Sequence, residues 1–104
     1  MVTTENAKRI AKKLVDIVSA AGIPIYKAYL FGSAACGRNH EYSDIDVALV
    51  SDKFTGVLFD DRKALNPFVI RIDSSLELHP FTVIDFSPDN PFANEIMKSG
   101  VLVC

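Results

Sequence analysis

Apolar residues recur every three or four positions at the start of the chain, a spacing that is typical of a helix with one buried face. The stripe consists of Ala7, Ile10, Ala11, Leu14, Ile17, Val18 and Ala21. Thr3 or Thr4 can cap the start of this helix, because a side-chain oxygen there accepts from the first orphan amides. Gly22 and Pro24 follow the stripe and predict its end.

Two further segments also have helical spacing. The first covers about residues 57–72, and its interior Pro67 predicts a kink or a break, because proline lacks an amide donor and clashes with the preceding turn. The second is short: Asn90-Pro91 opens it and Gly100 closes it.

Three other segments are predicted to be strands, covering residues 25–31, 44–50 and 76–81. Pro80 cannot donate to a ladder, so we expect it at a sheet edge or a strand end. The order helix, strand, loop, strand, helix, strand, helix predicts an α+β fold, an α/β sandwich in which helices pack on a small mixed sheet. The apolar tail 101–104 has three open roles: packing on the core, extending the sheet, or meeting another subunit.

Composition limits the class of protein. With 104 residues and 49% hydrophobic content, we expect residues 1–104 to form a single domain with one core. A net charge of -2 argues against general nucleic-acid binding. No apolar run is long enough for a bilayer and the start is polar, so we expect no membrane association and a cytoplasmic location. Cys36 and Cys104 have no metal-ligand spacing, which argues against a zinc site.

The chemistry is concentrated between the first two strands. Gly32 lets a backbone approach a phosphate, and Ser33 can offer both its amide and its hydroxyl. Strand alternation puts Asp44 and Asp46 on the same face, where two poorly solvated carboxylates need a cation. Magnesium is the natural candidate, because it prefers carboxylates together with substrate phosphates. Arg38 either adds a cation beside these phosphates or is an exposed loop arginine.

Gly32-Ser33, then Gly37, then Ser43-Asp44-Ile45-Asp46 running into an apolar strand resembles the motif of the DNA polymerase beta-type nucleotidyltransferase superfamily. Within it the chain is similar to the minimal nucleotidyltransferases, small domains often encoded beside a HEPN-domain partner in toxin–antitoxin pairs. The resemblance implies transfer of a nucleoside monophosphate from a nucleoside triphosphate, with ATP expected, to a protein or small-molecule hydroxyl. It also implies that two Mg²⁺ ions bind the aspartates.

The family usually supplies a third carboxylate, an aspartate, on the strand after the second long helix, and three residues here compete for that role. Asp73 falls at a helix C-terminus and looks like a linker residue. Asp85 completes a capping-box spacing that begins at Thr82, so a structural role accounts for it. Glu77 lies inside a strand, where an unpartnered carboxylate would be costly, and we expect it to ligate metal and accept the acceptor's proton. His79 shares its face and either flanks the site or has a structural role, and of these two alternatives we expect the structural role.

A different class of function competes with the enzyme. A minimal domain of this kind can act as a non-catalytic or weakly catalytic binding module that neutralises a partner protein. Retention of the paired aspartates favours the enzyme. In either case the small site predicts a second chain, either another copy or a HEPN-type partner, contacting the apolar tail and the segment 54–59. The sequence leaves the acceptor, the base preference and the oligomeric state open.

Overall fold

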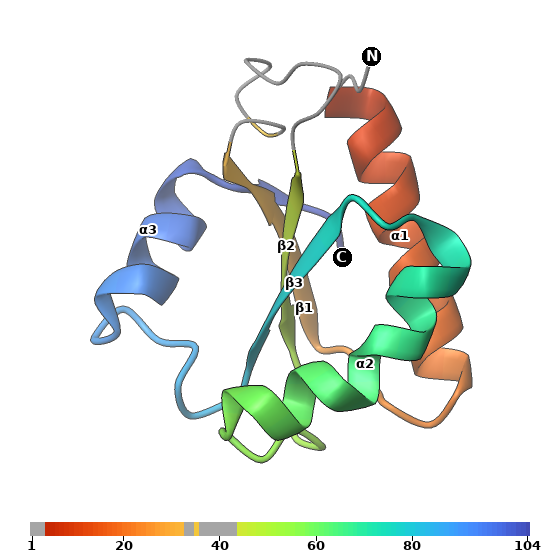
Figure 1. The fold of residues 1–104 in the computed structure, drawn as a ribbon. Coiled ribbons are helices and arrows are strands. Elements are labelled where there is room, and N and C mark those ends of the chain that lie inside the picture. Colours follow the sequence, from red (N-terminus) through yellow and green to blue (C-terminus); the bar gives the residue numbers. More distant parts are fainter. Residues whose placement is uncertain (1–3, 33–34, 36–43) are drawn as a thin grey trace.

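The computed structural model describes residues 4–32, 35 and 44–104, and this part of the chain forms a four-stranded sheet with three helices (Figure 1). In chain order the elements are α1 (Thr4–Ala20), β1 (Lys27–Phe31), β2 (Ile45–Val50), α2 (Leu58–Ile72), β3 (Leu76–Phe81), α3 (Pro91–Ser99) and β4 (Val101–Leu102). The α+β arrangement expected from the order of elements is therefore confirmed.

The sheet has the strand order β3-β2-β1-β4. β1 runs antiparallel to both β2 and β4, whereas β2 and β3 are parallel and are connected through α2. The apolar tail thus extends the sheet, which was one of its three expected roles. β3 is an edge strand of this sheet, and it accommodates Pro80 as predicted.

Helices cover both faces of the sheet (Figure 1). α1 and α2 pack on the face that carries Leu30, Val47 and Leu78, and together they form the larger core cluster. α3 covers the opposite face through Ala93 and Ile96, which form a second core cluster with Ala48, Val50 and Phe81 of the strands. Alternate residues of each strand therefore belong to different environments, and the odd and even positions of β2 face different helices.

The helix boundaries agree closely with the sequence pattern. α3 begins after Asn90, whose Oδ1 accepts from the amides of Phe92 and Ala93, and it ends at Gly100. α2 continues from Leu58 to Ile72 through Pro67, so the break that was one of two expectations there is absent. Packing of the α2 apolar face on the core, where Leu65 is buried, offsets the hydrogen bond that proline removes.

A buried carboxylate anchors the loop that leads into α2. Only 4% of Asp61 is exposed, and it accepts hydrogen bonds from the Thr55 amide at 2.8 Å, the Thr55 hydroxyl at 3.0 Å and the Gly56 amide at 3.0 Å. Its position in the first helical turn also complements the positive end of the helix. These contacts fix where α2 starts relative to the sheet.

None of the helices in the described ranges could span a membrane.

Candidate functional site

Two carboxylates face each other across the parallel strands β2 and β3. In the ladder register Asp46 pairs with Glu77, and two residues further along Ala48 pairs with His79. Ala48 packs in the α3-side cluster, so strand alternation puts Asp46 on that face as well. One ligand atom from each of Asp46, Glu77 and His79 lies within 4.8 Å of the others, which makes these three residues a candidate metal-binding group.

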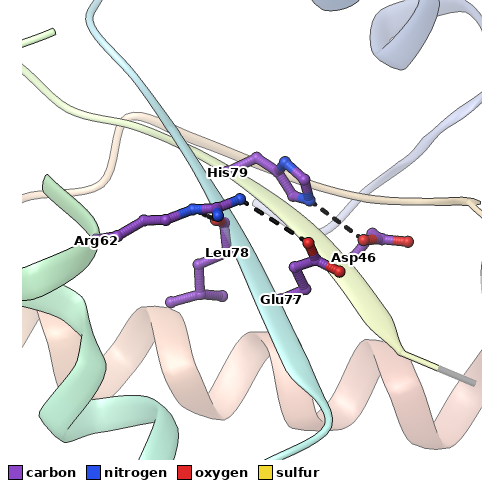
Figure 2. Close-up of polar contacts among 5 residues, drawn as sticks. All are labelled: Asp46, Arg62, Glu77, Leu78 and His79. Atoms are coloured by element: carbon purple, nitrogen blue, oxygen red, sulfur yellow. Dashed lines mark hydrogen bonds and ion pairs between the residues drawn. The ribbon is translucent and has the colours of Figure 1, made fainter. Parts of the chain in front are cut away.

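A hydrogen bond joins Asp46 to the histidine. His79 Nε2 lies 3.2 Å from Asp46 Oδ1, as drawn in Figure 2. The two side chains are 17% and 24% exposed, so water screens this contact only partly. Edge-on ring contacts hold the imidazole, with centroids 4.9 Å from Phe31 and 5.7 Å from Phe92. The histidine is therefore fixed by packing as well as by its bond to the aspartate.

An arginine approaches the second carboxylate from the opposite layer. Arg62, on α2, donates from Nε to the Leu78 carbonyl at 3.2 Å, and its Nη2 lies 3.9 Å from Glu77 Oε1 (Figure 2). Because β3 is an edge strand, the side chain can satisfy an edge carbonyl and still reach Glu77. Both charged side chains are exposed, at 40% and 45%, so this is a weak ion pair.

The end of β1 and the residue after it, Gly32, lie beside Asp46. Phe31, the last residue of β1, pairs with Asp46, and Gly32 follows with φ of +74°. A Cβ atom on Gly32 would lie 2.6 Å from Asp46 Oδ2, closer than real Cβ contacts occur. The backbone conformation therefore favours glycine, and a larger residue would also push the Asp46 carboxylate out of its present position.

The predicted site residues have different outcomes. Asp46 and Glu77 come together as expected from strand parity. Asp44 lies one residue before β2, is exposed, and stays outside the group of three. Ser33, Gly37 and Arg38 fall outside the described residues, as does the short helical turn expected after Ser33.

The two rejected candidates for the third carboxylate have local structural roles. Asp73 Oδ1 accepts from the Ser75 amide at 2.9 Å and from the Ser75 hydroxyl, which closes the turn after α2. The Asp85 amide donates to Thr82 Oγ1 at 3.0 Å, which is one half of the predicted capping box, although residues 82–86 form a turn rather than a helix. Neither carboxylate belongs to the candidate metal-binding group.

Sequence reasoning missed two contacts of this site. His79 was expected to have a structural role, yet it bonds to Asp46; its shared parity with Glu77 was the available signal. Arg62 was not singled out, because no sequence pattern shows that a helix side chain reaches round a sheet edge to another layer.

The donor set fits a hard divalent cation. Carboxylate oxygens are ligands that Mg²⁺ prefers, and opposite ligands of an octahedral Mg²⁺ stand about 4.2 Å apart, given bonds of about 2.1 Å. Ligand atoms that already lie within 4.8 Å of one another need only a small adjustment to reach this spacing. The exposed fraction of Glu77 leaves one side open to water or a substrate phosphate.

Comparison with known proteins identifies the family of the chain. The sequence model described as "Polymerase beta, Nucleotidyltransferase" matches residues 6–104, so the chain belongs to the polymerase beta nucleotidyltransferase family. The fold is similar to the 1.40 Å crystal structure of a candidate nucleotidyltransferase from Sulfolobus solfataricus, with a TM-score of 0.69 and 22% identity. That match covers 95% of this chain and 80% of the other. No curated protein matches the chain.

Proposed function

We propose that this domain is a magnesium-dependent nucleotidyltransferase that moves a nucleoside monophosphate from a nucleoside triphosphate, with ATP as the expected donor, to a hydroxyl of a protein or small molecule. Membership of the family supports transferase activity in general. The donor, the metal and the acceptor are the specific parts of the proposal.

One observation carries it: Asp46 and Glu77 face each other on adjacent strands while the Gly32 backbone lies against Asp46. Two carboxylates held on one open face repel each other unless a cation lies between them. A glycine backbone directly beside them allows phosphate oxygens to come close. The combination suits a metal-bound triphosphate better than it suits a structural ion pair.

Each residue then has a role in the proposed reaction. Asp44 and Asp46 hold the two metal ions, Glu77 completes the ligands of one ion and accepts the proton of the attacking hydroxyl, and Gly32 begins the phosphate-binding loop. Ser33, Gly37 and Arg38 are proposed to contact the phosphates from that loop. Bound magnesium supplies charge neutralisation at the transferring phosphate and the leaving pyrophosphate. No side chain of the site has to act as a nucleophile.

The longer side chain at position 77 is a departure from the family's aspartate. Its extra methylene moves the carboxylate oxygens, and transfer reactions tolerate little misplacement of reacting groups. In this structure Glu77 nonetheless lies within the 4.8 Å group with Asp46. The proposal therefore assigns Glu77 the third carboxylate's role.

A transfer assay tests the proposal. The protein is incubated with α-labelled ATP, Mg²⁺ and a cell extract as the source of acceptors, and transfer of label is measured. Glu77→Gln is expected to abolish transfer while nucleotide binding survives, because amide oxygen is a poor proton acceptor. Asp85→Asn, in an exposed turn, is the matched control and should transfer nearly normally. Equal transfer by wild type and Glu77→Gln would exclude this role for Glu77.

A second candidate function is a binding module for a partner protein, and an exposed apolar surface favours it. Leu58 and Phe59, at the start of α2, are 53% and 74% exposed. They line a hollow of about 540 Å³ together with Arg62, Lys63 and Asn66. The contact surface expected from the sequence was the apolar tail together with the segment 54–59. Phe54 and Val103 are buried and cannot take part, which leaves the start of α2 and the exposed Leu102 as the proposed contact surface.

We propose a HEPN-type helical protein as the first partner to test, with a second copy of this chain as the alternative. Co-expression with the product of a neighbouring gene, followed by size-exclusion chromatography, should give a complex that Phe59→Ser disrupts. Ile70→Ser is the matched control, because Ile70 is equally exposed on α2 but does not line the hollow. A complex that survives Phe59→Ser would place the contact elsewhere.

A further inference from the structure

Asp46 has two carboxylate oxygens, and the structure gives them different surroundings. Oδ1 lies 3.2 Å from His79 Nε2, and Oδ2 is the oxygen that a Cβ on Gly32 would meet. We propose that His79 is a positioning residue for Asp46: its Nε2–H holds Oδ1 and so keeps Oδ2 directed toward the metal and phosphate side of the site. This inference rests on the proposed function only in taking Asp46 as a metal ligand.

The chemistry of the pair determines which group donates. An ionised carboxylate can only accept hydrogen bonds, so His79 Nε2 carries the proton. A protonated nitrogen has no lone pair for a metal, so in this arrangement His79 supports a ligand instead of being one. Carboxylates that bind metals are commonly oriented by such outer hydrogen bonds.

The packing around the ring shows how its direction is fixed. His79 pairs in the ladder with Ala48, and its imidazole points toward Asp46, as seen in Figure 2. Phe31 and Phe92 contact the ring edge-on from the α3 side. An imidazole held by neighbours on this face loses little further freedom when it bonds to Asp46.

Glu77 provides an internal contrast. Within the described part of the chain its side chain contacts the exposed Arg62, at 3.9 Å, and 45% of the side chain is accessible. Asp46 is therefore the more firmly oriented carboxylate of the two. We expect the orientation of Asp46, and hence the affinity of the site for a metal alone, to depend on His79.

Metal binding without nucleotide tests this dependence. Free Mn²⁺ is measured by electron paramagnetic resonance during titration of wild type, His79→Phe, His79→Gln and Asp46→Asn. His79→Phe keeps an aromatic ring between Phe31 and Phe92 but loses the donor, and it should weaken Mn²⁺ binding about tenfold or more, the usual effect of removing an outer hydrogen bond. His79→Gln retains a terminal N–H and should recover most of that affinity.

A second readout uses the wild-type protein and does not depend on whether a variant folds. Long-range ¹H–¹⁵N spectra report which imidazole nitrogen is protonated, and sequential assignment of the wild-type spectrum distinguishes the two histidines of the chain, His40 and His79. Nε2 of His79 should remain protonated when diamagnetic Mg²⁺ is added. Loss of the Nε2 proton on binding would make His79 a ligand and overturn the proposal.

The outcomes separate this inference from the proposed function. If Asp46→Asn loses Mn²⁺ but His79→Phe binds it like wild type, the positioning role is wrong and the metal site stands. If Asp46→Asn binds Mn²⁺ like wild type, Asp46 is not a ligand and the proposed function fails, and the positioning role fails with it.

Discussion

Gly32 and Asp46 are in such close contact that a Cβ atom at position 32 would lie 2.6 Å from Asp46 Oδ2, so any side chain there would have to displace the carboxylate. The two residues are separated in the sequence by the loop between β1 and β2. The pairing of these strands, with Phe31 opposite Asp46, brings them together. The glycine of the motif thus leaves space for the Asp46 carboxylate, in addition to its expected role of letting the backbone approach a phosphate.

Gly32→Ala should therefore reduce metal binding as well as stability. A left-handed backbone costs a non-glycine residue about 1 kcal/mol, and the added methyl group must also displace the Asp46 carboxylate. Gly22→Ala is the matched control, because Gly22 also has positive φ, +104°, but a Cβ there meets nothing within 4 Å. Thermal melts should show a loss in both variants, whereas Mn²⁺ titration should show weakened binding in Gly32→Ala alone. Normal Mn²⁺ binding by Gly32→Ala would contradict the contact.

Removing the positive charge of Arg62 should strengthen the binding of a divalent cation. A unit charge about 4 Å from a carboxylate interacts by about 1 kcal/mol in water, and this attraction competes with a metal for Glu77. Arg62→Gln is expected to bind Mn²⁺ about fivefold more tightly at low salt, an advantage that should shrink as salt screens the charges.

Lys63→Gln is the control for that experiment. It removes one positive charge from the adjacent position of α2, and the ion pair with Glu77 belongs to Arg62. Its Mn²⁺ affinity should stay close to wild type. Equal gains in the two variants would mean that net charge, and not the contact with Glu77, sets the affinity.

Asp61 should be important for stability but not for the metal site. It is buried and accepts three hydrogen bonds from Thr55 and Gly56. A bond to a charged group contributes about 1.5–3 kcal/mol, but these contributions do not add in full here, because Thr55 and Gly56 are exposed and their donors can bond to water when the carboxylate is removed. We expect Asp61→Ala to lower the free energy of unfolding by about 3 kcal/mol in urea titrations. Asp60→Ala, its exposed neighbour, should change it by less than about 0.5 kcal/mol. Similar losses in both would show that the buried contacts contribute little.

Much of the fold could be predicted because local signals agree with the final packing. The stripe of α1, the Asn90-Pro91 start of α3 and the limits of β3 all followed from spacing and caps. Of the two alternatives predicted at Pro67, the break is absent: helix α2 continues through this residue, and its apolar face packs on the core.

The site was predictable only in part. Strand parity was enough to bring Asp46 and Glu77 to one face, and the register then made them neighbours. Parity could not distinguish a structural histidine from one that bonds to Asp46, since the direction of the imidazole also depends on its ring contacts with Phe31 and Phe92. The reach of Arg62 depends on the angle between α2 and the sheet edge, which no local pattern encodes.

Calorimetric titration with a nonhydrolysable ATP analogue, with and without Mg²⁺, tests the central claim most directly. The account predicts that wild type binds the analogue only when Mg²⁺ is present, and that Asp44→Asn, Asp46→Asn and the double variant bind it progressively less. Binding by the double variant that equals wild type, or binding that is independent of Mg²⁺, would contradict a metal-bound triphosphate at this site.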